Sequence, residues 1–203
     1  ADHEMADQVA IFFLAGHETS ASALAWALYL VATDRTVQLR IRDEAHKKQE
    51  DLSFSDISGM KFTRDVMREA LRLYPPVPML VREPQCPLDF RDRTIRAGDQ
   101  VVISPWHLQR HERLWRDPDV FDPDRWSSDN IERCPREAYI PFSAGPRVCP
   151  GAGFAMAESV LLLSSLIRAF EFEPVEDRVP EPIAHLTVRA RDGIWLKARP
   201  MSG

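Results

Sequence analysis

The chain has 203 residues, of which 44% are apolar and 28% charged, an ordinary globular composition that suffices for one sizeable hydrophobic core. Its formal net charge is -5, and no run of lysine or arginine is long enough to follow a phosphate backbone, which argues against nucleic acid as a partner. Cys86, Cys134 and Cys149 are too widely spaced for a disulfide framework or a C-x-x-C zinc site, so we expect a reducing, cytoplasmic setting.

The chain begins at Ala1 instead of methionine and enters a helical pattern at once, so we interpret it as a fragment or a processed chain. Residues 3–32 contain no proline, and apolar side chains face nearly every side of the predicted helix, which is typical of a central helix buried in a large domain. The only apolar stretch of membrane length, residues 9–32, is interrupted by residues 16–20. Charge there would be costly in hydrocarbon, so we expect no membrane span.

Two more helices are predicted in the first half of the chain. Asp34 is placed to cap a helix that runs through VQLRIRDEAHKK, where alternating charges indicate a solvated face. A short helix in FSDISG then precedes a longer one, KFTRDVMREALRLY, which Pro75 and Pro76 terminate.

Beyond Pro76 the sequence predicts small sheets and an ordered meander. In RTIRAGDQVVIS, residues 97–99 indicate a turn between two strands, and WRDPDVFDPDRW is rich in turn formers. A helix is expected from about residue 153 to residue 170, and the chain is expected to end in a β-hairpin whose turn is Asp192-Gly193. These patterns predict a mainly α protein with small β-sheets.

The stretch FSAGPRVCPG, residues 142–151, surrounds one cysteine with turn formers. Cys149 precedes a long helix, whose N-terminal partial charge favours a thiolate, and a thiolate is a soft metal ligand. Gly145 allows the backbone to turn tightly and approach something flat, Phe142 is placed to cover one side, and Arg147 to pair with an anion. The alternative is that Cys149 is a small buried hydrophobe in a loop entering a helix.

These residues match the pattern F-x-x-G-x-R-x-C-x-G, which resembles the haem-binding loop of the cytochrome P450 family. The resemblance implies that Cys149 is the proximal thiolate ligand of the iron of haem b, a ligand that favours O–O cleavage. It also implies that Arg147 meets a propionate and that Phe142 packs near the porphyrin. Gly145 and Gly151 are then part of the cofactor site, where amides after the cysteine tune the sulfur.

A second polar motif, AGHETS, lies in the middle of the first predicted helix. Glu18 and Thr19 must be hydrogen-bonded or face a cavity there, because an unpaired buried carboxylate is costly. One alternative is purely structural, with the Thr19 hydroxyl bonded to the Ala15 carbonyl. The motif also resembles the oxygen-activation segment of the same family. That resemblance implies that Ala15 and Gly16 lie at the cofactor, that Gly16 leaves room for O₂, and that Thr19 and Glu18 take part in proton delivery.

EALR supplies a third match. By itself an i, i+3 pair of Glu69 and Arg72 is ordinarily an exposed ion pair of little energetic value. In its place between the two other motifs, however, it resembles the E-x-x-R of the family, whose partner arginine corresponds to Arg125 in FDPDRW. We expect these three residues to stabilise the fold without acting in catalysis.

Several positions are secondary. Arg82 stands where the family often directs an arginine to a propionate, although a solvated loop arginine is an alternative. Gln109-Arg110 replaces a histidine and arginine common in the family, which puts one propionate contact in doubt. His107 and His111 have helical metal spacing, but without a third ligand zinc is disfavoured.

Residues 1–203 thus resemble the carboxyl-terminal part of the cytochrome P450 fold as one partial domain. The implied activity is that of a haem-thiolate monooxygenase, which inserts one atom of O₂ into an apolar small molecule using electrons from a ferredoxin or a flavoprotein reductase. Residues around AGHETS, with Met79 and Leu80, would line an apolar pocket. The alternatives are a peroxide-driven enzyme of the same type, an inactive truncated remnant, or a zinc-binding or helical interaction module.

Overall fold

The computed structural model describes residues 2–48, 52–127, 129–130 and 134–201. Its helices are α1 (Asp2–Thr33), α2 (Arg35–His46), α3 (Lys61–Leu73), the single turn α4 (Pro105–Leu108) and α5 (Ala152–Ala169). Short 3₁₀ turns lie between them: η1 (Phe54–Gly59), η2 (Pro123–Trp126), η4 (Arg136–Ala138) and η5 (Gly145–Arg147). The predicted succession of helices is confirmed.

Local signals set the ends of these helices as the sequence predicts. Asp34 caps α2, because its Oδ1 accepts hydrogen bonds from the backbone N–H groups of Thr36 and Val37 at 2.9 and 3.1 Å. Helix α3 stops at Leu73, before Pro75 and Pro76. Helix α5 starts directly after the FSAGPRVCPG stretch.

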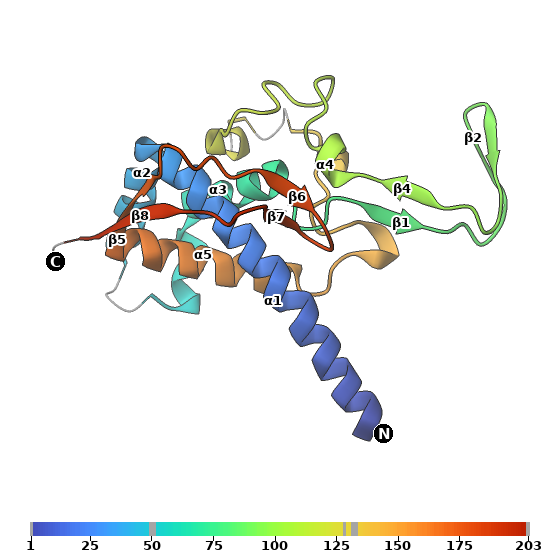
Figure 1. Cartoon of the computed structure of the whole chain (residues 1–203), viewed down its shortest axis with the longest axis horizontal. Helices are drawn as coiled ribbons and strands as arrows, with labels where there is room; N and C mark the ends of the chain where they lie inside the picture. The colour runs from blue at the N-terminus through green and yellow to red at the C-terminus, as the bar shows by residue number, and fades with distance from the viewer. Residues whose placement is uncertain (1, 49–51, 128, 131–133, 202–203) are drawn as a thin grey trace.

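Helices α1, α2, α3 and α5 pack together around the main hydrophobic core (Figure 1). Its largest contributors include Ile41, Met67, Leu163 and Ile167, all fully buried. Trp26 of α1 stacks on Tyr74 at the end of α3, with ring centroids 3.9 Å apart, which joins the two helices.

The first half of α1 is exposed, whereas its second half supplies buried side chains such as Ala27 and Val31 to the core. Figure 1 shows the first half of α1 (blue) extending away from the other elements. Its large apolar side chains are 56 to 68% exposed: Met5, Val9, Ile11, Phe12, Phe13 and Leu14. An all-round apolar pattern indicates a helix that packs on several sides, but the side chains that would cover this half are not among the described residues.

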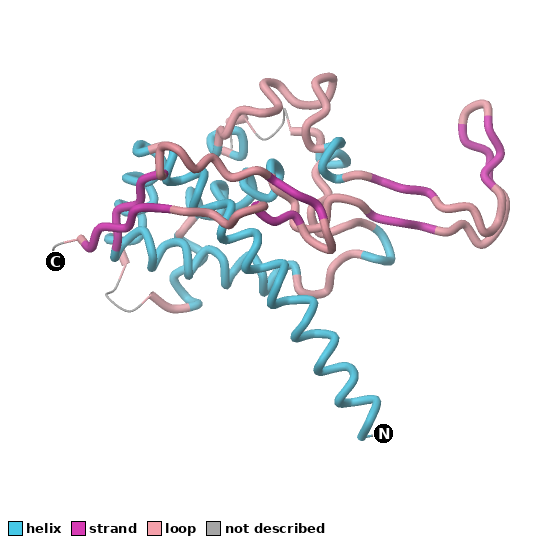
Figure 2. Tube along the Cα trace, in the orientation of Figure 1, coloured by secondary structure: helices cyan, strands magenta, loops and turns pink. Residues whose placement is uncertain are grey.

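The described strands form two-stranded antiparallel ladders. β1 (Leu80–Arg82) pairs with β4 (Val101–Ile103), β2 (Leu88–Phe90) with β3 (Arg93–Ile95), β5 (Phe170–Pro174) with β8 (Leu196–Pro200), and β6 (Pro182–Ala184) with β7 (Val188–Ala190). Figure 2 shows the first two ladders extending from the side of the molecule opposite the C-terminus. The predicted turn at residues 97–99 is present between β3 and β4, with Gly98 at φ +90°, although each of these strands pairs with another strand.

The predicted hairpin around Asp192-Gly193 is wrong in its pairing. The chain does turn there, with Gly193 at φ +79°, but β7 and β8 on either side belong to different ladders. The hairpin near the chain end is β6–β7, and β8 returns instead to β5. A turn dipeptide determines where the chain reverses, whereas contacts distant in sequence select the partner strand.

Helix α5 is the one described helix that is long and apolar enough to cross a membrane by length and composition. The apolar stretch of membrane length noted in the sequence, residues 9–32, does not meet this criterion, whereas α5 was not expected to. Helix α5 packs against α1, α2 and α3 and buries Val160, Leu163 and Ile167. The core helices of globular proteins satisfy the same criterion.

Candidate functional site

The Cys149 loop, residues 142–151, is closed by its own backbone. The Cys149 N–H donates to the Phe142 carbonyl at 2.9 Å, and the Val148 N–H donates to the Gly145 carbonyl at 3.1 Å. Phe142 is half-buried and packs against the main core, which attaches the loop to the helices. Cys149 itself is exposed, unlike the small buried hydrophobe of the alternative. The loop thus presents a thiol outward at the N-terminal end of α5.

Two glycines of this loop differ in their surroundings. Gly145 has φ +65°, a left-handed conformation that strains other residues, and a Cβ built there would meet no atom within 4 Å. A Cβ on Gly151 would lie 3.8 Å from the Cys149 Sγ, in van der Waals contact with the sulfur. Gly145 thus faces open space, and Gly151 lies beside the sulfur.

Arg82 and Arg147, predicted separately, line one hollow of about 770 Å³ together with Val81, Glu83 and Gln85. The Arg82 guanidinium also donates from Nη2 to the Ser143 Oγ at 2.8 Å, which fixes β1 against the Cys149 loop. Two guanidinium groups beside one open hollow suit a ligand that carries carboxylates. The haem propionates fit this requirement, and the exposed thiol fits the iron.

The AGHETS motif lies where α1 passes from exposed to buried surroundings. The Thr19 hydroxyl donates to the Ala15 carbonyl at 2.7 Å, as the structural alternative predicts, and α1 continues without a break. A Cβ on Gly16 would meet no atom within 4 Å, so this turn of α1 faces open space. Among the described residues, no hydrogen bond joins this motif to the Cys149 loop.

Glu18 contacts the C-terminal hairpin instead. Its Oε1 accepts hydrogen bonds from the Thr187 hydroxyl at 2.5 Å and from the Arg189 Nε at 2.9 Å. The Thr187 hydrogen bond, followed by that of Arg189, lowers the pKa of the Glu18 carboxyl below its ordinary value. The expectation that this carboxylate is hydrogen-bonded is confirmed, but sequence patterns gave no signal for its partners.

Glu69, Arg72 and Arg125 come together as predicted. The Arg72 Nε and Nη2 donate to the two oxygens of Glu69 at 2.9 and 2.8 Å, and the Arg125 Nε reaches Oε1 at 3.3 Å. The Glu69 and Arg72 side chains are 0% exposed, so the alternative of an exposed pair is wrong. Arg72 also donates to carbonyls of the meander, those of Pro118 and Val120. This network joins α3 to the meander.

Gln109 belongs to the same network, which the sequence analysis missed. This fully buried amide donates to the carbonyls of Leu71 and Arg72, both at 3.0 Å, and accepts from the Ile140 N–H at 2.9 Å. Its polar atoms are thus bonded to backbone, so Gln109 has a structural role. The signal available in the sequence was that a glutamine stands here where the family commonly has a histidine. The neighbouring Arg110 guanidinium lies over the Trp106 ring, 3.9 Å from its centroid.

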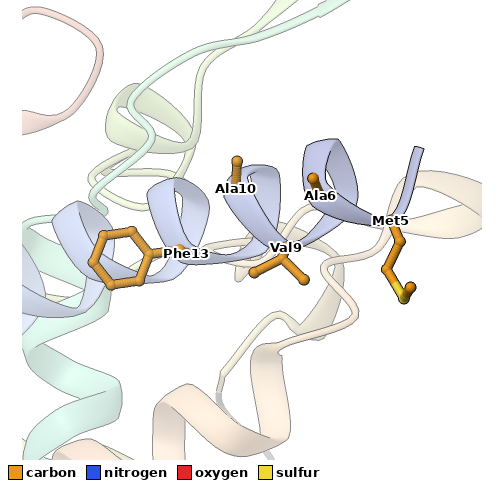
Figure 3. Close-up of a pocket in the computed structure, with 5 residues that line it drawn as sticks. All are labelled: Met5, Ala6, Val9, Ala10 and Phe13. Atoms are coloured by element: carbon orange, nitrogen blue, oxygen red, sulfur yellow. The ribbon is translucent and has the colours of Figure 1, made fainter. Parts of the chain in front are cut away.

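In the described ranges, no group of three or more His, Cys, Asp or Glu side chains is placed to hold a metal ion. A second hollow, of about 550 Å³, follows the exposed part of α1 (Figure 3). Its lining is Met5, Ala6, Val9, Ala10 and Phe13, without a charged group to orient a ligand. It is an open apolar surface along α1.

Comparison with known proteins decides the family. Residues 1–200 match the sequence profile described as Cytochrome P450. The chain belongs to the cytochrome P450 family. Human "Cytochrome P450 4A11" is 36% identical over 203 residues, which are 98% of this chain and 39% of that protein. Rat "Cytochrome P450 4B1" is 34% identical, with 100% of this chain and 40% of the relative covered.

A solved P450 structure agrees. "Crystal structure of a Cytochrome P450 (CYP102L1)" superposes on 100% of this chain and 47% of that chain, with a TM-score of 0.92 and 29% sequence identity. This P450 chain therefore has the mainly helical family fold with small sheets, and it spans about two fifths of the length of the curated relatives it matches.

Proposed function

We propose that this P450 chain is part of a haem-thiolate monooxygenase that inserts one oxygen atom from O₂ into an apolar organic substrate. The observation that carries the proposal is the exposed Cys149 thiol at the N-terminal end of α5, in a loop whose Arg147 lines one hollow together with Arg82. Family membership supports the same reaction class. The electron donor is proposed to be a ferredoxin or a flavoprotein reductase.

Haem would be held by three features of this chain. The Cys149 thiolate would bind the iron, the Arg82 and Arg147 guanidinium groups would meet the propionates, and the glycines would let the backbone lie close to the ring. When bound, haem supplies the activation of O₂, so that one oxygen atom passes to the substrate and the other is reduced to water.

The AGHETS residues of α1 would provide room for O₂ and deliver protons to it. Gly16 leaves its turn of the helix open, which admits a small molecule such as O₂. Since the Thr19 hydroxyl hydrogen is engaged by the Ala15 carbonyl, the Thr19 oxygen is oriented as an acceptor for a water or another donor. The Thr187 hydroxyl and two nitrogens of Arg189 already contact Oε1 of Glu18. We propose that Glu18 passes protons to the Thr19 oxygen.

Apolar side chains support the proposed substrate class. Phe12, Phe13 and Leu14 directly precede AGHETS and are more than 60% exposed, and Met79 is 55% exposed on the loop before β1. An exposed apolar surface binds a hydrocarbon better than a charged ligand, because binding removes apolar area from contact with water.

The test is the absorbance spectrum of the full-length protein after reduction and exposure to CO. We expect the Soret band at the red-shifted position that thiolate ligation produces, and we expect Cys149→Ser to abolish that band because a serine oxygen is not a soft ligand. Cys86→Ser provides the control, since Cys86 is also exposed but is not part of the Cys149 loop. A band that survives Cys149→Ser would contradict the ligand assignment.

A further inference from the structure

One face of α1 holds the C-terminal hairpin. Glu18, Ser22 and Trp26 follow one another at intervals of four residues, so their side chains lie along one stripe of the helix. The Ser22 hydroxyl and the Trp26 Nε1 both donate to the Val188 carbonyl, at 2.5 and 3.2 Å. With the bonds from Thr187 and Arg189 to Glu18, three consecutive hairpin residues are fixed to this stripe.

The two oxygens of Glu18 are used differently. Thr187 and both contacting nitrogens of Arg189 reach Oε1, while no described residue donates to Oε2. Thr187 is buried, whereas the Arg189 and Glu18 side chains are 57% and 27% exposed. The carboxylate is therefore anchored at Oε1, and Oε2 has no donor among the described residues. The charged or titratable groups that act on it are Arg189 from β7 and His17 from α1 itself.

We propose that Arg189 is a positioning residue for Glu18: with Thr187 it anchors Oε1 to the C-terminal hairpin and leaves Oε2 to exchange protons in the reaction proposed above. This inference rests on the proposed function for the proton step only. The anchoring itself is a property of α1 and β7 and is open to a separate measurement.

Ionisation follows from the same geometry. Because Thr187 and Arg189 favour the charged form, the pKa of Glu18 is lowered, and the proton that Glu18 accepts at Oε2 is held weakly and passed on. Replacing Arg189 by an uncharged residue raises this pKa toward its ordinary value. The acid side of any pH profile that depends on Glu18 then moves to higher pH.

The experiment compares Arg189→Gln, Arg189→Lys, Arg191→Gln and Arg199→Gln in the haem-loaded, full-length protein. Arg191 is the control for the pH profile, because it directly follows β7, its side chain is 55% exposed and it pairs with Glu181 at 2.8 Å without touching Glu18. Because that pair links the two ends of the hairpin, Arg199→Gln is added as the control for hydrogen exchange.

The first measurement is amide hydrogen exchange of residues 182–190 at neutral pH. We expect exchange to be roughly 2- to 5-fold faster in Arg189→Gln, the range for an exposed ion pair, and close to wild type in Arg199→Gln, which removes an exposed ion pair to Glu173 outside the hairpin.

The second measurement is the ratio of product to hydrogen peroxide as a function of pH. We expect the acid limb to move upward in Arg189→Gln, to return toward wild type in Arg189→Lys, and to stay in place in Arg191→Gln. Unchanged exchange in Arg189→Gln would overturn the anchor, whatever the reaction. Faster exchange with superimposable pH profiles would overturn the proton role alone, and absence of turnover in wild type would reject the proposed function while leaving the exchange result to judge the anchor.

Discussion

Two glutamates of this chain meet arginines from distant segments, and their surroundings differ. Glu69 is 0% exposed, and both of its oxygens accept hydrogen bonds: Arg72 reaches each of them, Arg125 and the Asp122 N–H reach Oε1, and Trp126 reaches Oε2. Glu18 is 27% exposed and bonded at one oxygen. A carboxylate with every acceptor site occupied in the interior can only stabilise the fold, whereas one with a free oxygen remains available for chemistry.

The largest effect is expected at the buried glutamate. In Glu69→Gln the amide cannot satisfy the two arginines, so their buried charge is left uncompensated, and we expect a loss of about 3–5 kcal/mol in the free energy of unfolding. Urea denaturation followed by circular dichroism measures it. Glu18→Gln is the matched control and should unfold near the wild-type midpoint. Equal losses in the two variants would remove the distinction between the two glutamates.

A smaller loss is expected when a neutral member of the network is removed. Gln109→Leu leaves the Ile140 N–H and the carbonyls of Leu71 and Arg72 without their side-chain partner. We expect a loss on the order of 2 kcal/mol in the free energy of unfolding, because leaving a buried polar group without a hydrogen bond costs about 1–3 kcal/mol. The same denaturation experiment on Gln85→Leu, at an exposed loop position, should show little change. A stable Gln109→Leu variant would show that the amide is dispensable.

The smallest effect is expected at the surface. Arg40 forms two 2.7 Å hydrogen bonds to Asp124, but the side chains are 44% and 53% exposed. We expect Arg40→Gln to cost about 0.5 kcal/mol and the cost to shrink in high salt. The Arg40 hydrogen bond lowers the pKa of Asp124. This contribution is therefore complete above the ordinary aspartate pKa and is lost as the pH falls through the lowered value, and thermal unfolding across pH should show the variant and wild type converging in acid.

Elements with local signals were predictable from the sequence. The Asp34 cap, the proline stop after α3 and the start of α5 each depend on residues within a few positions. The Glu69, Arg72 and Arg125 association was reached only through family resemblance, since an i, i+3 pair does not reveal whether it is buried. Resemblance likewise pointed to Arg82 and Arg147 separately, and the structure adds that they line one hollow.

What escaped prediction depends on contacts between distant residues. Asp192-Gly193 signalled a turn correctly, yet nothing nearby indicates that β8 pairs with β5. The apolar pattern of α1 is the same in its exposed and its buried half, so the pattern could not show where along the helix the side chains become buried. Glu18 has partners 169 and 171 residues away, and no spacing rule connects them.

That separation has a consequence for synthesis. Thr187 and Glu18 are 169 residues apart, so the polar middle of α1 leaves the ribosome long before the hairpin that docks on it. At about 5–20 residues per second, roughly 10–30 seconds pass between the two events. Throughout this interval the stripe of Glu18, Ser22 and Trp26 lacks its final partner, and chaperones have that long to act on the nascent helix.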